Sequence, residues 1–176
     1  MRELILGGAR SGKSRLAEER AAGTGHSVCY IATATAGDGE MAARIRRHRE
    51  RRPAAWTTIE SPRDLAGAVN GAAAPGRCVL IDCLTLWLAN CLAGEEGEWP
   101  RARAAFLEAV AAAPGQLVFV ANEVGLGIVP DNALARRFRD EAGQLNQAVA
   151  GACERVTFVA AGMPLVLKQP EPDAPP

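Results

Sequence analysis

The chain has 176 residues, of which 48% are hydrophobic and 23% are charged. Its 20 basic and 20 acidic residues give a formal net charge of +0, so the composition indicates no general polyanion-binding surface. The length is sufficient for one domain whose core needs neither disulfides nor metal. No secretory signal is evident, and no apolar stretch reaches the ~18 residues that a transmembrane helix requires, so we expect a cytoplasmic protein.

The cysteines form no recognisable metal-binding or disulfide framework. Their number is odd, no two are spaced as Cys-x-x-Cys, and most stand in apolar runs. We therefore expect small buried thiols in a reducing compartment rather than zinc ligands or disulfides. The cysteines are Cys29, Cys78, Cys83, Cys91 and Cys153.

The most informative stretch comes early, where residues 7–14 read GGARSGKS and fit the phosphate-binding pattern G-x-x-x-x-G-K-[ST]. A strand is predicted before it at 3–6, and a helix after it at 14–22, stopping at Gly23. Glycines let backbone N–H groups turn toward an anion, and the helix N-terminus adds its dipole. The alternative is an ordinary glycine-rich turn with a surface lysine, which the order of strand, loop and helix disfavours.

Each part of this phosphate loop has a predicted role. Lys13 supplies a positive charge to the β- and γ-phosphates of a nucleotide, and Ser14 supplies a hydroxyl ligand to Mg²⁺. The predicted phosphate-binding residues are Gly7, Gly8, Ala9, Arg10, Ser11, Gly12, Lys13 and Ser14.

Downstream, short apolar runs alternate with amphipathic stretches. The predicted strands are 27–32, 56–59, 78–82, 117–121 and 156–160, with a candidate hairpin partner at 164–167. The predicted helices are 39–51 capped by Asp38, one that starts with Ser61 as its cap, 84–90, 100–113, and a long one capped by Asp131. The long helix carries an apolar stripe made of Leu134, Phe138, Ala142, Leu145 and Val149.

This alternation predicts an α/β fold, in which a mostly parallel sheet with helices on both faces forms a single domain over residues 1–168. The Pro-rich tail, 169–176, is predicted to be disordered. Ligands bind beyond the carboxyl ends of the strands in such sheets. The segments that follow strands should therefore converge on one crevice; they are the phosphate loop, Thr33–Gly37, Glu60, Asp82 and Asn122–Glu123.

The helix predicted over 39–51 is the second informative stretch. Met41, Ile45 and His48 share one of its faces, while arginines occupy the others. A lone histidine on an apolar face is most simply a packed side chain, but neighbouring positive charge would disfavour the imidazolium and keep the ring nucleophilic. The arginines are most simply a solvated basic face. A nucleic-acid patch is disfavoured by the neutral chain and by the lack of stacking aromatics in this segment.

Two other polar residues have simpler interpretations. Asp82 closes a buried strand after a phosphate loop, which makes it the natural acid for Mg²⁺; a helix cap is the alternative, and the two roles are compatible. His26 stands at the start of a strand without charged neighbours of this kind, so we interpret it as structural.

Taken in order, these motifs resemble the bifunctional adenosylcobinamide kinase/adenosylcobinamide-phosphate guanylyltransferase family of cobalamin biosynthesis. The phosphate loop alone is shared with many unrelated proteins, whereas the ordered set is specific and spans nearly the whole chain. The matching segments are 7–14, Tyr30–Thr33, Glu40–Ile45 leading to His48, Arg52-Pro53, Asp82–Thr85, Asn122–Gly125, Gly127–Pro130 and Asn146-Gln147.

The resemblance implies a RecA-like fold and two reactions. ATP or GTP would phosphorylate the aminopropanol hydroxyl of adenosylcobinamide. His48 would then attack the α-phosphorus of GTP, release pyrophosphate and carry GMP to adenosylcobinamide phosphate, giving adenosylcobinamide-GDP. Lys13, the arginines and Mg²⁺ would neutralise the leaving pyrophosphate. Family members form trimers, which suggests a homo-oligomer.

The resemblance also implies nucleotide contacts outside the phosphate loop. Many family members have Gly where Arg51 stands, and some have Glu in place of Asp82, which preserves a carboxylate. Glu123 is the candidate for orienting the cobinamide hydroxyl. The implied nucleotide contacts are Ala32, Thr33, Ala34, Arg49, Glu50, Arg51, Arg52, Glu60 and Asp82, and the implied metal ligands are Ser14 and Asp82.

Two other functions are compatible with a phosphate loop. One is a small-molecule kinase without guanylyltransferase activity, in which His48 is merely packed. The other is a RecA-like nucleotide switch that binds DNA or a partner protein, which the lack of a recognisable DNA-binding arm disfavours. We expect no nucleic-acid partner.

Overall fold

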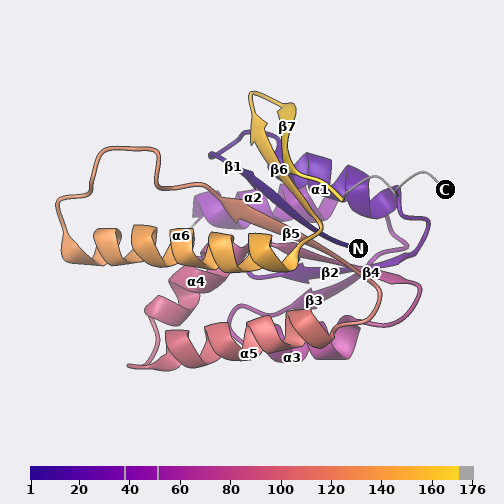
Figure 1. Cartoon of the computed structure of the whole chain (residues 1–176), viewed down its shortest axis with the longest axis horizontal. Helices are drawn as coiled ribbons and strands as arrows, with labels where there is room; N and C mark the ends of the chain where they lie inside the picture. The colour runs from indigo at the N-terminus through magenta and orange to yellow at the C-terminus, as the bar shows by residue number, and fades with distance from the viewer. Residues whose placement is uncertain (38, 51, 171–176) are drawn as a thin grey trace.

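A seven-stranded sheet forms the centre of the computed structural model, which describes residues 1–37, 39–50 and 52–170 (Figure 1). The strands lie in the order β3-β2-β4-β5-β1-β6-β7, and neighbouring strands are parallel except for β6 and β7. The predicted, mostly parallel sheet is therefore confirmed. The strands are β1 (Arg2–Gly7), β2 (Ser27–Ala32), β3 (Thr57–Glu60), β4 (Arg77–Asp82), β5 (Gln116–Asn122), β6 (Arg155–Ala160) and β7 (Met163–Lys168).

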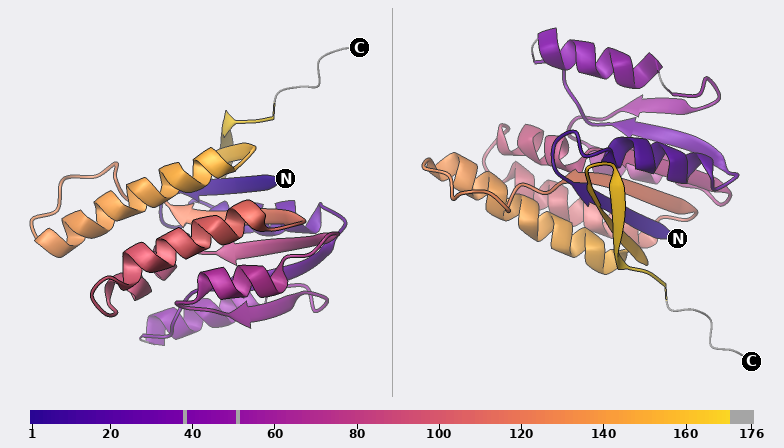
Figure 2. Two further views of the ribbon diagram at one scale, coloured as in Figure 1. Left: turned by 60° about the horizontal axis from the view of Figure 1, so that its bottom comes forward. Right: turned by 90° about the horizontal axis from the view of Figure 1, so that it is seen from above.

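Helices cover both faces of this sheet, as predicted. Together with α4, the helices α3, α5 and α6 cover one face, where α3, α5 and α6 lie side by side (Figure 2). On the other face, α1 packs Ala17 and Ala21 against the strands. The helices are α1 (Lys13–Ala22), α2 (Gly39–Glu50), α3 (Leu65–Ala72), α4 (Leu84–Leu92), α5 (Glu98–Ala112) and α6 (Ala133–Ala152).

The central strands are continuous apolar runs because both of their sides are covered. All four residues from Cys78 to Ile81 in β4 are buried, which is the pattern of a parallel strand between two helical layers. In β1, Leu4 and Leu6 pack into one layer, while Ile5 between them packs into the other.

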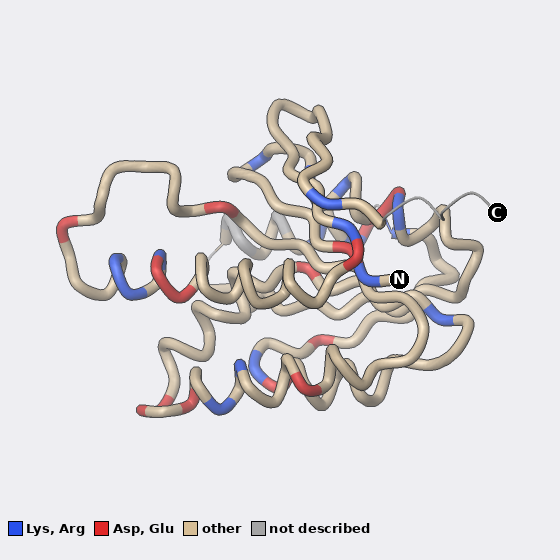
Figure 3. The backbone as a smooth tube through the Cα atoms, viewed as in Figure 1, with Lys and Arg blue, Asp and Glu red and all other residues tan. Residues whose placement is uncertain are grey.

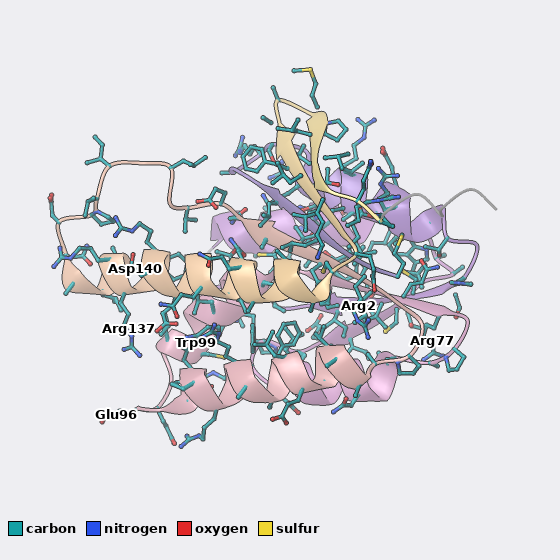
Figure 4. All side chains as sticks on the ribbon, in the orientation of Figure 1. Arg2, Arg77, Glu96, Trp99, Arg137 and Asp140 are labelled. Atoms are coloured by element: carbon teal, nitrogen blue, oxygen red, sulfur yellow. The ribbon has the colours of Figure 1, made fainter. Side chains whose placement is uncertain are left out.

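An aromatic cluster joins the helical layer to the sheet. The ring centroid of Phe106 lies 4.9 Å from that of Trp87 and 6.0 Å from that of Phe119, in tilted and edge-on arrangements. Trp99, labelled in Figure 4, packs against Trp87 at 5.2 Å. Its indole N–H donates to Glu141 of α6 at 2.7 Å. These contacts connect α4, α5 and α6 with β5.

The strand register brings the polar ends of the strands to one edge. Gly7 lies opposite Asn122, and Ala32 lies opposite both Glu60 and Asp82. Because these strands are parallel, their carboxyl ends share that edge, where a ligand site is expected.

The start of α3 differs from the prediction. This helix begins at Leu65, and its cap is Asp64, whose carboxylate accepts a hydrogen bond from Gly67 N at 2.9 Å. Ser61 is not the cap, because its hydroxyl donates to the carbonyl of Asp64 at 2.7 Å and so closes the preceding turn.

The start of α6 also differs. The predicted cap, Asp131, is wrong: the cap is Asn132, whose extended backbone lets its side chain accept a hydrogen bond from Ala135 N at 2.7 Å. Leu134 is 65% exposed, since this end of α6 projects beyond the sheet (Figure 1), whereas the stripe from Ala142 onward is buried as predicted.

The turn between β4 and α4 shows whether Asp82 caps a helix. The cap of α4 is Cys83, whose sulfur accepts from Leu86 N, so Asp82 is not a helix cap.

The predicted burial of all five cysteines is confirmed, and all are free thiols.

Some predictions fall outside the described residues. They are the Asp38 cap, the Arg51 contact and the disorder of 171–176, all of which stay predictions.

Among the described helices, none combines the length and apolar character needed to cross a membrane. Basic and acidic residues are interspersed along α5 and α6 (Figure 3), in keeping with the balanced charge of the chain.

Candidate active site

A cavity of about 510 Å³ opens at the carboxyl end of the sheet. Its volume is within the ~300–1,000 Å³ range of small-molecule sites. The residues predicted for the site that line it are Lys13, Ser14, Ala32, Ala34, His48, Arg49, Arg52, Glu60 and Asp82. The other lining residues are Tyr30, Thr35, Ala36, Ala42, Ile45, Arg46, Pro62, Cys83, Leu86 and Asn122.

The phosphate loop connects β1 to α1 in a tight turn. Gly12 has φ 99°, a left-handed conformation that favours glycine, and α1 begins at the next residue. Lys13 is almost buried as a residue, and its ammonium donates to the carbonyl of Gly8 at 3.1 Å. The turn between β6 and β7 supports the loop, because Gly162 N donates to Ser11 O at 2.8 Å. The N-terminal dipole of α1 thus faces the site where phosphates would bind.

Tyr30 links a cation and an anion of the cavity wall. Its hydroxyl donates to Asp82 Oδ2 at 3.0 Å, and the guanidinium of Arg52 lies over its ring, with Cζ 3.4 Å from the centroid. Burial, and next the charge of Asp82, raise the pKa of Tyr30 well above its usual range. The phenol therefore stays protonated and acts as a hydrogen-bond donor to the carboxylate.

His48 reaches the cavity from the last turn of α2. Its Nδ1 lies 3.9 Å from Oε1 of Glu18 in α1, so the histidine lies close to the helix that follows the phosphate loop. The next residue, Arg49, forms an ion pair with Glu60 at the end of β3. The final turn of α2 therefore contacts both α1 and the β3 edge.

Thr33 organises the floor of the site from a buried position. Its hydroxyl donates to Cys83 O at 2.7 Å and accepts from Cys83 N at 2.8 Å, and its carbonyl accepts from the side-chain amide of Asn90 at 2.8 Å. Burial raises the pKa of the Cys83 thiol to about 11, so this residue is a neutral thiol near pH 7 and not a nucleophile.

Several residues predicted for the site do not line the cavity. The Thr33 side chain is fully buried beneath it, and Glu50 is exposed. The carboxylate of Glu123 accepts a hydrogen bond from Gly125 N within its own loop, whereas its neighbour Asn122 lines the cavity. The role of Glu123 toward the cobinamide hydroxyl stays a prediction.

Sequence reasoning gave no role to Tyr30 or Glu18. Tyr30 is the single tyrosine of the chain and the single aromatic residue of β2, two residues before the strand end, which is a usable signal. Glu18 gives no such signal, because its approach to His48 depends on where the fold places the end of α2 relative to α1.

The donor set fits Mg²⁺. Ser14 and Asp82 both line the cavity, and their oxygen atoms are the ligands that Mg²⁺ prefers. Over residues 1–37, 39–50 and 52–170, no group of three or more His, Cys, Asp or Glu side chains could hold a metal ion by itself. The site therefore suits a cation that takes its other ligands from nucleotide phosphates and water.

A phosphate loop at the carboxyl end of a parallel sheet, with an acid and a basic helix facing the same cavity, defines a phosphate-loop nucleotide-binding protein. The family model described as cobinamide kinase / cobinamide phosphate guanyltransferase matches residues 3–167. The chain belongs to this family.

Similar proteins support that membership. The chain is 57% identical over 169 residues to the bifunctional adenosylcobalamin biosynthesis protein CobP of Pseudomonas aeruginosa, covering 96% of this chain and 98% of the relative. It is 42% identical over 179 residues to the bifunctional protein CobU of Salmonella typhimurium, covering 94% and 98%.

Solved structures support the fold. The RadB recombinase superposes with a TM-score of 0.50 at 14% identity, covering 89% of this chain and 73% of its own. A prototypical ATPase from the type III secretion system of pathogenic bacteria has a TM-score of 0.55 at 13% identity, covering 94% and 57%. The predicted RecA-like fold is confirmed.

Proposed function

We propose that this chain performs both reactions of its family, phosphorylating adenosylcobinamide and then transferring GMP from GTP to adenosylcobinamide phosphate through His48. The observation that carries the proposal is a single cavity lined by Lys13 and Ser14 of the phosphate loop and also by His48. A nucleotide held by the loop is thus available to two acceptors.

In the first reaction, the phosphate loop holds a triphosphate, with ATP and GTP both as candidates. The substrate hydroxyl attacks the γ-phosphorus and loses its proton to water, while the bond to the β–γ bridging oxygen breaks and the diphosphate leaves with its electrons. Lys13 offsets charge on the transferred group and on the leaving diphosphate. Ser14 and Asp82 would hold Mg²⁺, which supplies further charge neutralisation when bound.

In the second reaction, His48 acts on the α-phosphorus of GTP. Its ring nitrogen forms a bond to phosphorus as pyrophosphate leaves, and the substrate phosphate then displaces the histidine. This route divides one displacement into two in-line steps. Arg49 and Arg52 line the same cavity and are placed to balance the phosphate charge.

The rest of the nucleotide would lie against the wall formed by Ala32, Ala34, Glu60 and Asp82. The carboxylate of Glu60 can accept hydrogen bonds from a base or a ribose hydroxyl, while that of Asp82 is the proposed Mg²⁺ ligand. Glu60 already pairs with Arg49, which orients both side chains. Arg51 belongs to the proposed contacts on resemblance alone.

Assembly and location are further parts of the proposal. The loop that leads from β5 to α6 projects away from the sheet (Figure 1). Its residues Leu126, Ile128 and Val129 are highly exposed, as is Leu165 of β7. Exposed apolar side chains of this kind suit contacts between subunits, and we propose the trimer that the family suggests. We place the enzyme in the cytoplasm, where its nucleotide substrates are found.

The decisive experiment follows the α-phosphate of GTP and the γ-phosphate of ATP separately. α-Labelled GTP with Mg²⁺ should leave an acid-labile adduct on the protein, and γ-labelled ATP should label adenosylcobinamide. His48→Ala should abolish the adduct while keeping the kinase reaction. His26→Ala is the matched control and should keep both, because His26 is exposed and does not line the cavity.

The same experiment separates the alternative functions. A wild-type protein that phosphorylates adenosylcobinamide but never forms an adduct would be a kinase without guanylyltransferase activity. Failure of both reactions would contradict the proposal altogether.

A further inference from the structure

His48, in the last turn of α2, and Glu18 of α1 approach each other. Nδ1 of His48 is 3.9 Å from Oε1 of Glu18, and the two side chains are only 22% and 14% exposed. Nδ1 is shielded from solvent and forms no hydrogen bond with any residue in the described part of the chain. Since a shielded ring nitrogen is stabilised by a hydrogen-bonding partner, the nearby carboxylate is well placed to act on it.

We propose that Glu18 is a positioning residue for guanylyl transfer, whose carboxylate holds the proton of His48 on Nδ1 and leaves Nε2 as the nucleophile. This inference rests on the proposed role of His48 as GMP carrier. A neutral imidazole has one N–H, and a partner at one nitrogen fixes which nitrogen has it. The separation of 3.9 Å is longer than a hydrogen bond, and such contacts often tighten only when substrate is bound.

The charge changes during the reaction favour the same arrangement. The lone pair of Nε2 forms the bond to the α-phosphorus of GTP, the α–β bridging P–O bond breaks, and pyrophosphate leaves with those electrons. The proton stays on Nδ1, so the ring of His48 becomes a cation. The carboxylate of Glu18 stabilises that charge where it develops.

The second transfer reverses these changes. An oxygen of the substrate phosphate attacks the phosphorus, and the electrons of the N–P bond return to Nε2. The ring of His48 is then neutral and still has its proton on Nδ1. Because Glu18 keeps this proton in place throughout, the histidine is ready for the next GTP without a proton transfer.

The position of Glu18 in the fold connects the nucleophile to the phosphates. Glu18 lies in α1, the helix that begins at Lys13 directly after the phosphate loop. The neighbouring Glu19 instead faces solvent and pairs with Arg15 at 2.8 Å. Glu19 is therefore a matched control for Glu18, on the same helix but away from His48.

The first test is nitrogen NMR of the full chain prepared with isotope-labelled histidine. The chain has 2 histidines, and His48→Ala assigns their signals. With the imidazoles neutral, we expect His48 to be protonated at Nδ1 and bare at Nε2. Glu18→Gln should shift it toward the Nε2–H form, whereas Glu19→Gln should not. A wild-type His48 protonated mainly at Nε2 would overturn the proposal without relying on any variant at Glu18.

The second test is single-turnover labelling with α-labelled GTP. We expect Glu18→Gln to slow adduct formation by about 10- to 100-fold. Glu18→Asp keeps the charge and should recover part of the rate, while Glu19→Gln should stay within about twofold. A wild-type rate in Glu18→Gln would overturn the role of Glu18 alone. No adduct on the wild-type protein would instead overturn the proposed function of His48.

Discussion

The guanidinium of Arg52 lies over the buried ring of Tyr30, with Cζ 3.4 Å from the ring centroid, while the Tyr30 hydroxyl donates to Asp82 at 3.0 Å. One side chain of β2 therefore supports two oppositely charged groups of the cavity wall. A cation over an aromatic face is worth about 0.5–2 kcal/mol, depending on its exposure. Tyr30 thus fixes the positions of groups that we expect to meet the nucleotide.

Tyr30→Phe separates these two contacts, because it keeps the ring under Arg52 but removes the donor to Asp82. We expect kcat/KM for nucleotide to fall about tenfold in both reactions, equivalent to ~1.4 kcal/mol, the size of a hydrogen bond to a charged group. Steady-state kinetics of each reaction measures the effect. Thr58→Ala is the control, since it removes only an exposed 3.5 Å contact with Arg52, and should stay within about twofold. Unchanged kinetics in Tyr30→Phe would show that Asp82 is positioned without the phenol.

Gly7→Ala tests why the phosphate loop begins with glycine. A Cβ at Gly7 would lie 2.5 Å from both the carbonyl oxygen of Val159 and Oγ of Ser11, and the backbone carbonyl cannot rotate away. We expect the free energy of unfolding to fall by about 1–3 kcal/mol, as for other overpacked sites. Denaturant unfolding without nucleotide measures this change.

Gly8→Ala is the matched control for that prediction. A Cβ at Gly8 would meet no atom within 4 Å, so we expect a change in stability of no more than about 0.5 kcal/mol. Equal stability losses in the two variants would contradict the steric explanation.

The fold and the outline of the site follow from local patterns in the sequence. The apolar run from Cys78 to Ile81 can be recognised as a strand covered on both sides, and the phosphate loop has a fixed spacing. Parallel strands then bring Glu60 and Asp82 to the loop, because all their carboxyl ends share one edge. Residues far apart in the sequence can therefore be predicted to meet when they end parallel strands of one sheet.

The remaining details depend on packing that no local pattern specifies. Glu18 and His48 lie on different helices. The spacing of apolar residues in α1 and in α2 does not indicate that these two side chains come together. Glu123 and Asn122 are adjacent in the sequence, yet only Asn122 lines the cavity. Which of two neighbouring polar residues faces a site depends on the backbone conformation at the end of the strand. Secondary-structure propensities do not determine that conformation.

At the start of α6, two neighbouring polar residues, Asp131 and Asn132, could each be the helix cap. Stability measurements can distinguish them. Asn132 accepts a hydrogen bond from Ala135 N at 2.7 Å, whereas Asp131 precedes the cap. We expect Asn132→Ala to lower the free energy of unfolding by about 1 kcal/mol, and Asp131→Ala by less than about 0.5 kcal/mol. Thermal or denaturant unfolding of the two variants compares them, and a larger loss in Asp131→Ala would reverse the assignment.

Lys13→Met should affect both reactions, unlike substitution of His48. Lys13 lines the cavity from the loop that we propose to hold the phosphates in either transfer, so its loss should remove charge stabilisation from both transition states. We expect each rate to fall by at least about 100-fold. Arg15→Gln is the control, because Arg15 is two residues further along, 75% exposed and paired with Glu19, and its rates should stay within about twofold. A Lys13→Met protein that kept adduct formation on His48 while losing the kinase reaction would show that GTP for guanylyl transfer is held outside the phosphate loop, and that one cavity does not serve both reactions.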